Sequence, residues 1–192
     1  EDNPYGELRY TGEDLPSIKS FDDEGIVIYA GSFSKVLSPG LRVGYSVSPA
    51  EITAKMTVGK QASDVHSPMI CQMIVDRWLA ECDTAEHIGF IRSVYSRKLN
   101  LMCDCLDSEI SGFISYVRPL GGLFIWCELD RNINMLDFCK AAAAENVAVV
   151  PGTAFMASES DRTNCFRLNF STPTDEQIVE GVKILKKVCE KF

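Results

Sequence analysis

Several features that mark particular classes of protein are missing from this sequence. No apolar run approaches the roughly 18 residues that a membrane-spanning helix needs, and no basic-then-apolar signal sequence opens the chain. Lysine and arginine number 19 against 27 aspartates and glutamates, which gives a formal net charge of −8. Because this segment has no basic face to neutralise phosphates, we do not expect it to bind nucleic acid or an anionic membrane. We expect a cytoplasmic protein whose partners are small molecules or other proteins.

Histidine is also scarce, and the cysteines do not follow a metal-ligand pattern. His66 and His87 are the two histidines, and the eight cysteines show no paired C-x-x-C spacing. A zinc site is therefore not expected. Several cysteines occupy apolar-periodic positions, which favours reduced, buried thiols over disulfides.

The composition is that of a globular α/β protein. The 192 residues are 46 % hydrophobic and 24 % charged, with mean hydropathy near zero. Residues 25–33 and 41–48 are β-branched and aromatic runs typical of strands. Helical periodicity then covers 49–82, with a helix start at His66-Ser67-Pro68, and a second helix follows over about 84–108.

The C-terminal half alternates between strand and helix patterns. Residues 112–119 and 121–129 predict an antiparallel pair of strands, and 134–147 predicts a helix. Strands at 147–152 and 165–171 and a closing helix at 174–192, capped by Thr174, complete the pattern. We expect three parts: 1–48 in one α/β sheet, 49–90 as connecting helices, and 91–192 as a compact α/β domain.

A small-residue turn after the first strand run carries the first candidate chemistry. The segment "GSFSKVLSPGLRVGY", residues 31–45, places Lys35 in the turn with Ser32, Ser34 and Arg42 around it. A desolvated lysine can form an imine with a carbonyl compound, and hydroxyls with a guanidinium suit a phosphate monoester. A surface lysine and arginine flanking an ordinary loop explain the segment about equally well.

Ser32-x-x-Lys35 also matches the S-x-x-K motif of serine acyl-enzymes. In those enzymes the motif opens a helix and is accompanied by S-D-N and K-T-G elements. Here Pro39 obstructs a helix, Val65 follows Ser63-Asp64, and K-T-G is absent. The pattern therefore disfavours an acyl-enzyme.

Two further patterns become informative in combination. Asp2-x-x-Tyr5 offers a carboxylate for a pyridine nitrogen and a phenol for a ring hydroxyl, although alone it predicts only a turn. Arg167 interrupts an apolar strand in "CFRLNFS". Such an arginine either lines a pocket or pairs with a surface carboxylate at a sheet edge.

Taken in order, Asp2, Tyr5, Ser32, Lys35, Arg42 and Arg167 resemble the site residues of the fold-type I pyridoxal-phosphate (PLP) enzymes, the aspartate-aminotransferase superfamily. The segments "EDNPYGELRY", "GSFSKVLSPGLRVGY", "GGLFIWCEL", "VVPGTAF" and "FRLNFS" are most similar to the branch with 2-aminoadipate and kynurenine aminotransferases. The resemblance implies the C-terminal portion of this α/β fold. Residues 1–48 would be the last strands of the PLP-binding large domain, and 91–192 the small domain.

The resemblance also implies a role for each site residue. Lys35 would form the Schiff base with PLP and move the substrate's Cα proton. Asp2 would keep the pyridine nitrogen protonated, and Tyr5 would bond the ring oxygen. Ser32 and Arg42 would bind the phosphate, with Ser34 a weaker candidate, and Arg167 would hold the substrate α-carboxylate.

These roles imply a ping-pong aminotransferase acting on an α-amino acid and a 2-oxo acid, a homodimer when complete. Because the upstream phosphate loop and ring-stacking residue of the family are absent, we expect an incomplete fragment that is inactive by itself. Two alternatives share the cofactor: the aminotransferase-like effector domain of a winged-helix transcriptional regulator, and a PLP-dependent lyase. The motifs "DNPYG" and "FSKVLSP" favour the aminotransferase over the regulator.

Overall fold

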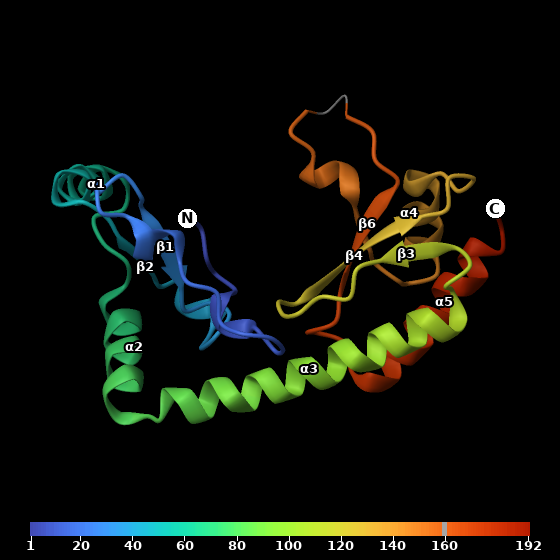
Figure 1. Cartoon of the computed structure of the whole chain (residues 1–192), viewed down its shortest axis with the longest axis horizontal. Coiled ribbons are helices and arrows are strands. Elements are labelled where there is room, and N and C mark those ends of the chain that lie inside the picture. Colours follow the sequence, from blue (N-terminus) through green and yellow to red (C-terminus); the bar gives the residue numbers. More distant parts are fainter. Residues whose placement is uncertain (159–160) are drawn as a thin grey trace. The chain divides into compact units, whose positions relative to one another are not determined.

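The computed structural model describes residues 1–158 and 161–192, which divide into two compact units, Glu1–Arg92 and Ser93–Phe192 (Figure 1). The boundary lies inside the long helix α3 (Thr84–Glu109). The three-part division expected from the sequence stays a prediction. In the described part of the chain, no helix is both long and apolar enough to cross a membrane.

A short antiparallel hairpin is the centre of the first unit. Strands β1 (Tyr29–Ser32) and β2 (Gly44–Val47) pair with Ser32 opposite Gly44. Both are shorter than the runs that predicted them. Before β1, the Asp22 carboxylate accepts hydrogen bonds from the Ile26 and Val27 amides at 2.9 and 3.0 Å. These amides are therefore taken by a loop side chain, and the strand begins later.

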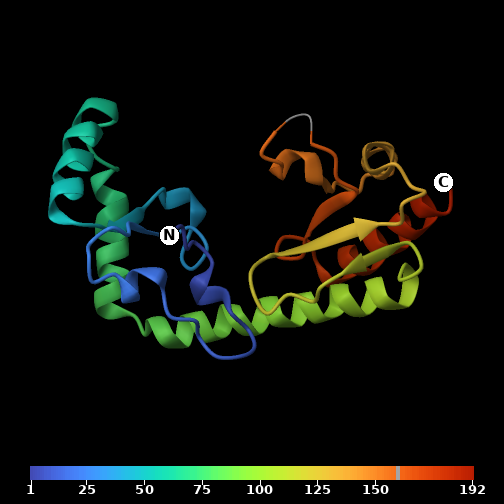
Figure 2. The ribbon, with the colours of Figure 1, turned by 45° about the horizontal axis from the view of Figure 1, so that its top comes forward.

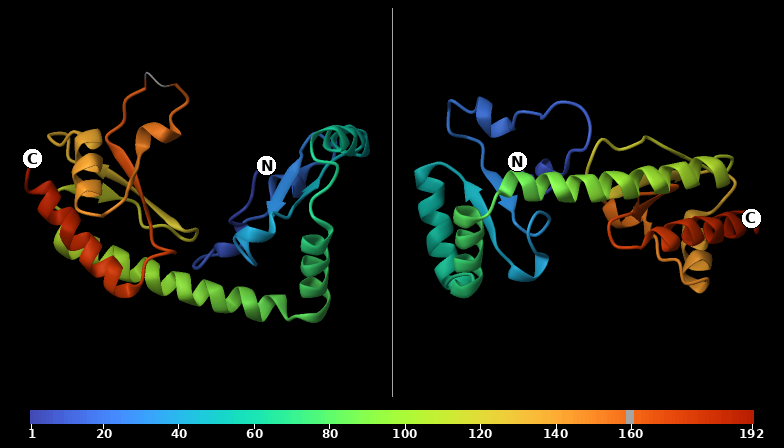
Figure 3. Two further views of the ribbon diagram at one scale, coloured as in Figure 1. Left: turned by 180° about the vertical axis from the view of Figure 1, so that it is seen from behind. Right: turned by 90° about the horizontal axis from the view of Figure 1, so that it is seen from below.

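Two helices follow the hairpin, as the periodicity predicted (Figure 3). Helix α1 (Ala50–Ser63) ends before a bend in which Val65 has a φ of 67°. Helix α2 (Met69–Glu81) begins after Pro68, whose ring fits the start of a helix and not its interior. The predicted helix start at 66–68 is therefore confirmed.

The second unit is a four-stranded antiparallel sheet with helices. The strands β3 (Ile114–Tyr116), β4 (Phe124–Leu129), β5 (Val150–Pro151) and β6 (Cys165–Asn169) pair in the order β3-β4-β6-β5. The predicted antiparallel pair at 112–129 is confirmed as β3 and β4. The run at 147–152 yields only a two-residue strand, because the chain turns into a 3-10 helix, Gly152–Phe155.

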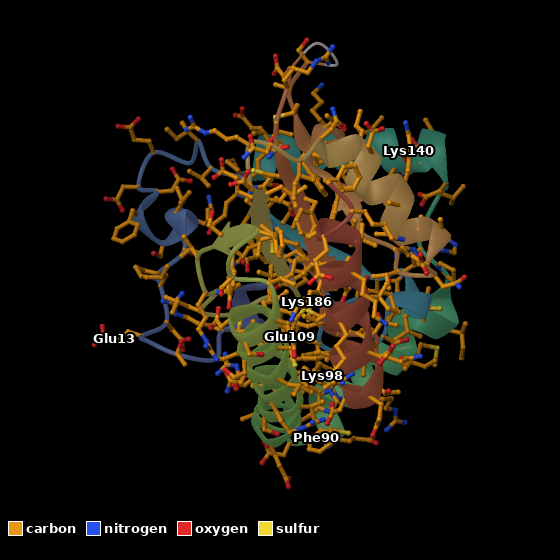
Figure 4. The ribbon with its side chains drawn as sticks, turned by 90° about the vertical axis from the view of Figure 1, so that its right-hand side faces the viewer. Glu13, Phe90, Lys98, Glu109, Lys140 and Lys186 are labelled. Atoms are coloured by element: carbon orange, nitrogen blue, oxygen red, sulfur yellow. The ribbon has the colours of Figure 1, made fainter. Side chains whose placement is uncertain are left out.

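The core of the second unit lies on one face of this sheet. Alternate residues Ile125, Cys127 and Leu129 of β4 are buried. Helices α3 and α5 (Asp175–Cys189) run side by side (Figures 2 and 3), and Figure 4 shows Lys186 of α5 beside Glu109 of α3, with Nζ and Oε2 3.0 Å apart. On α4 (Met135–Ala144), the Phe138 ring packs 5.0 Å from that of Phe166.

The start of α5 confirms the predicted cap. Thr174 Oγ1 accepts a hydrogen bond from the Gln177 amide at 3.3 Å. In return, Gln177 Oε1 accepts one from the Thr174 amide at 2.8 Å. This reciprocal capping box satisfies donors that the first helical turn leaves unpaired.

All eight cysteines are free thiols, but burial holds for only some of them. Cys103, Cys127 and Cys189 are buried, and burial raises the pKa of Cys127 to about 12. Cys82 is exposed, so the expectation of burial is wrong there. Its position just after α2, where the chain leaves the helix in an extended conformation, places the thiol at the surface.

Candidate functional site

Lys35 lies in a single helical turn between β1 and β2. The Leu37 and Ser38 amides both donate to the Phe33 carbonyl, at 2.9 and 3.1 Å. Pro39 then starts a separate 3-10 turn, Pro39–Leu41. The lysine therefore does not open a continuous helix, which is the geometry that an S-x-x-K acyl-enzyme needs.

The N-terminal segment runs beside β1, which places Asp2 beside Ala30 and Tyr5 close to Lys35. The Asn3 amide donates to the Ala30 carbonyl at 2.9 Å, and the Ala30 amide donates to the Glu1 carbonyl at 2.8 Å. These two bonds form a parallel bridge between Asp2 and Ala30. The sequence could not show this pairing, because its partners are 28 positions apart.

The Lys35 ammonium faces an aromatic ring instead of a carboxylate. Its Nζ lies 5.8 Å from the centroid of the Tyr5 ring, within the range of a cation–π contact. No ion pair involves Lys35 within residues 1–158 and 161–192. An amine without a carboxylate partner keeps its nitrogen available for a carbonyl ligand.

Ser32, Ser34 and Arg42 lie at the same end of the hairpin. The Ser34 amide donates to Ser32 Oγ at 3.1 Å, so the Ser32 hydroxyl keeps its own hydrogen for another acceptor. The Phe33 amide donates to the Val43 carbonyl at 3.1 Å and closes the loop. Arg42 has a φ of 55°, and its Nη1 donates to the Pro39 carbonyl at 3.3 Å, which leaves most of the guanidinium donors for a ligand.

Aromatic rings pack together at the hairpin. The Tyr45 ring covers Gly31 so closely that a Cβ there would lie 2.3 Å from a ring atom. Burial, together with the hydrogen bond to Tyr29, raises the pKa of Tyr45. A cavity of about 390 Å³ lies in this unit, with Tyr29, Tyr45 and Trp78 in its lining. Ser32 is the one predicted site residue among the residues that line this cavity.

Arg167 lies in the second unit, on the interior strand β6. Its register partners are Trp126 on β4 and Val150 on β5. In the described part of the chain it has no ion pair, so the alternative of an edge-strand arginine paired with a surface carboxylate is wrong. Its Nε is buried and has no hydrogen-bond partner among the described residues.

Two aromatic residues that the sequence analysis did not select contact Arg167. The guanidinium carbon Cζ lies 3.9 Å from the Phe124 ring centroid and 4.6 Å from that of Phe155. Both phenylalanines lie in segments quoted for the resemblance, but nothing local marks them as neighbours of Arg167. Only the register of β4 with β6 and the turn after β5 bring them together.

The donor set of the first unit fits pyridoxal phosphate. Ser32, Ser34 and Arg42 supply hydroxyl and guanidinium donors for a phosphate dianion. Lys35 supplies an amine for the aldehyde, and Asp2, which is exposed beside β1, supplies a carboxylate for the ring nitrogen. The roles assigned to these residues, including the Tyr5 hydroxyl, remain predictions.

Comparison with known proteins places the chain in a family. The family model for class I and II aminotransferases matches residues 2–185. The 2-aminoadipate transaminase of Thermus thermophilus is 41 % identical over 193 residues, which cover 99 % of this chain and 48 % of that protein. The solved kynurenine aminotransferase of Pyrococcus horikoshii, in complex with PMP and kynurenine, superposes with a TM-score of 0.94 at 37 % identity. That match covers 100 % of this chain and 47 % of the other.

A transcription regulator also matches. The uncharacterised helix-turn-helix-type regulator YjiR of Escherichia coli is 32 % identical over 183 residues, which cover 95 % of this chain and 38 % of the regulator.

The chain spans about half the length of the aminotransferases it matches. On the match of the family model over nearly its whole length, the chain belongs to the class I and II aminotransferase family.

Proposed function

We propose that the protein carrying this chain is a pyridoxal-phosphate-dependent aminotransferase that moves the amino group of an α-amino acid to a 2-oxo acid. The observation that carries the proposal is Lys35, an amine without an ion pair in the described residues, held in a turn among hydroxyl and guanidinium donors. Similarity to aminotransferases over the whole chain supports it.

Six residues of the first unit would hold the cofactor: Asp2, Tyr5, Ser32, Ser34, Lys35 and Arg42. When bound, pyridoxal phosphate supplies an aldehyde that condenses with amines and a pyridinium ring that withdraws electrons from the substrate Cα. Asp2 would hold the proton on the ring nitrogen, and the Tyr5 hydroxyl would bond the ring oxygen. Ser32 and Arg42 would anchor the phosphate, with support from Ser34.

Lys35 and Arg167 would act on the substrate. Lys35 Nζ would take the proton from the substrate Cα and deliver it to C4′ of the cofactor, the carbon that keeps the amino group. Arg167 would bind the α-carboxylate through its guanidinium N–H donors, a two-point contact that fixes the direction of the Cα–H bond. A second half-reaction with a 2-oxo acid would return the enzyme to its starting form.

Two alternatives use the same residues. The similarity to YjiR favours, as a second candidate, the cofactor-binding effector domain of a transcription regulator. A lyase differs only in which Cα bond is cleaved, and the residues described here serve both reactions. A cytoplasmic location and a homodimer are further parts of the proposal, based on the sequence analysis.

The test is spectroscopic and uses the complete reading frame that contains this chain. We expect a cofactor absorbance band that disappears when an amino acid is added and returns with 2-oxoglutarate. A band that never responds to any amino acid would instead favour the regulator. A band that responds while a 2-oxo acid and ammonia accumulate, with no return on adding 2-oxoglutarate, would favour the lyase.

Lys35→Ala should remove the band and lower turnover by at least about 10³-fold, because both the amine and the proton carrier are lost. Without cofactor, the unfolding midpoint should change little, because Lys35 has no ion pair in the described residues and its contact with the Tyr5 ring is weak. Lys55→Ala, at an exposed position of α1, is the matched control and should leave both the band and turnover intact. Normal turnover of Lys35→Ala would contradict the proposal.

A further inference from the structure

Among the described residues, the Arg167 guanidinium contacts aromatic rings and has no hydrogen-bond partner. Within residues 1–158 and 161–192, no hydrogen bond or ion pair fixes its orientation. The two contacts that do involve it are the Phe124 ring at 3.9 Å and the Phe155 ring at 4.6 Å from Cζ. A long, flexible side chain therefore depends on these two rings for its position.

The two rings come from different elements. The position of Phe124 follows from strand pairing, and that of Phe155 follows from the packing of a 3-10 helix against β6. Phe124 is the first residue of β4 and pairs with Asn169 of β6, two positions beyond Arg167. Phe155 ends the 3-10 helix that follows β5. This helix approaches β6 so closely that a Cβ on Gly152 would lie 2.4 Å from the Cys165 carbonyl oxygen.

Phe155 has a further support in Trp126. The two rings meet edge to face with centroids 5.5 Å apart, and Trp126 is the register partner of Arg167 on β4. Both rings are partly open to solvent, at 44 % for Phe155 and 40 % for Trp126. The edge-to-face contact with Trp126 therefore supports the position of Phe155, although neither residue is buried in the core.

We propose that Phe124 and Phe155 are positioning residues that hold the Arg167 guanidinium ready for a carboxylate ligand. The inference rests on the proposed function, in which Arg167 binds the substrate α-carboxylate. The two rings hold the guanidinium in place before the ligand arrives, so the carboxylate binds without first ordering the arginine. Loss of either ring would weaken carboxylate binding and leave the chemistry at Lys35 unchanged.

The experiment compares Phe155→Leu and Phe124→Leu with Phe155→Tyr in the protein expressed from the complete reading frame. Kinetic constants are measured for an amino acid and for 2-oxoglutarate. Calorimetry measures the Kd of hexanoate, which has a carboxylate but no amine, and of hexanamide, which has the same chain without the charge. Phe192→Leu, an exposed phenylalanine at the C-terminus, is the matched control.

We expect each leucine variant to raise KM and the Kd of hexanoate by about tenfold, with kcat within about twofold. Hexanamide binding should not change, and Phe155→Tyr and Phe192→Leu should behave like the unmodified protein. Unchanged hexanoate binding in both leucine variants would overturn the inference. An equal loss of hexanoate and hexanamide would also overturn it, because the rings would then contact the ligand directly and not act through Arg167.

Failure of the inference and failure of the proposed function give different results. If Arg167→Ala raises KM and weakens hexanoate binding while the phenylalanine variants do not, the function stands and the positioning role is wrong. If the unmodified protein shows no transamination, the proposed function fails. The hexanoate measurement then still decides the positioning role, because it requires no turnover.

Discussion

The two units of this chain differ in where their apolar side chains lie. Of the buried apolar residues in the described chain, only Leu8, Val36 and Val75 belong to Glu1–Arg92, whereas twenty-two belong to Ser93–Phe192. Conversely, sixteen of the large exposed apolar residues belong to the first unit. The second unit therefore has a hydrophobic core of its own, while the first holds its candidate site residues mainly through backbone bonds and turns.

Helices α2 and α5 show this contrast most clearly. Met69, Met73 and Ile74 on α2 are spaced for one face, yet all three are exposed, and Val75 is the buried residue of that helix. On α5, Ile178, Val182 and Leu185 form a buried stripe. An amphipathic pattern thus identifies a helix, but burial depends on whether a partner surface is present.

The largest expected difference between the units is in thiol reactivity. Cys82 of the first unit is exposed, while Cys127 of the second is buried with a pKa of about 12. At pH 8 that pKa leaves only about one Cys127 thiol in 10⁴ ionised, so we expect Cys82 to react at least about 10³-fold faster. A thiol reagent combined with mass spectrometry of the 192-residue chain measures both rates. Cys82→Ser should remove the rapidly labelled peptide that contains position 82, and rapid labelling of Cys127 would contradict the expected difference between the units.

The second largest difference between the units is expected in the loss of unfolding free energy when an apolar side chain is truncated to alanine. Phe138 of α4 is 0 % exposed and packs on Phe166, so Phe138→Ala should lower the free energy of unfolding by about 3–5 kcal/mol. Leu79→Ala, on the exposed side of α2, should cost less than about 0.5 kcal/mol. Urea unfolding followed by circular dichroism measures both changes. Equal costs would show that the first unit also depends on a packed core at α2.

The smallest predicted effect concerns the cap of α5. Thr174→Ala removes the side chain that accepts the Gln177 amide, so we expect a loss of about 1 kcal/mol in the second unit. Hydrogen exchange at the first turn of α5 should become faster. Thr172→Ala, two residues before the cap, is the control and should leave exchange unchanged. Unchanged exchange in Thr174→Ala would show that packing, and not the cap, determines the start of the helix.

Much of the fold could be predicted from local patterns. The helices at 50–63, 69–81, 84–109, 135–144 and 175–189 follow from apolar periodicity, from Pro68 and from the Thr174 cap. Strand lengths were less predictable. The Asp22 carboxylate takes the amides of Ile26 and Val27 ahead of β1, a local side-chain contact that the β-branched pattern of the run does not reveal. The turn at Gly152 that cuts β5 short packs against Cys165, which no local window relates to it.

The same distinction between local patterns and contacts between distant segments applies to the candidate site. The sequence alone determined which chemical groups the protein has: an amine, hydroxyls, guanidinium groups and a carboxylate in an order that resembles aminotransferases. Tertiary structure decided that Asp2 pairs beside Ala30, that Lys35 faces the Tyr5 ring, and that Phe124 and Phe155 flank Arg167. The physical reason is that side-chain chemistry is carried by each residue separately, whereas contacts depend on strand register and close backbone approach between distant segments.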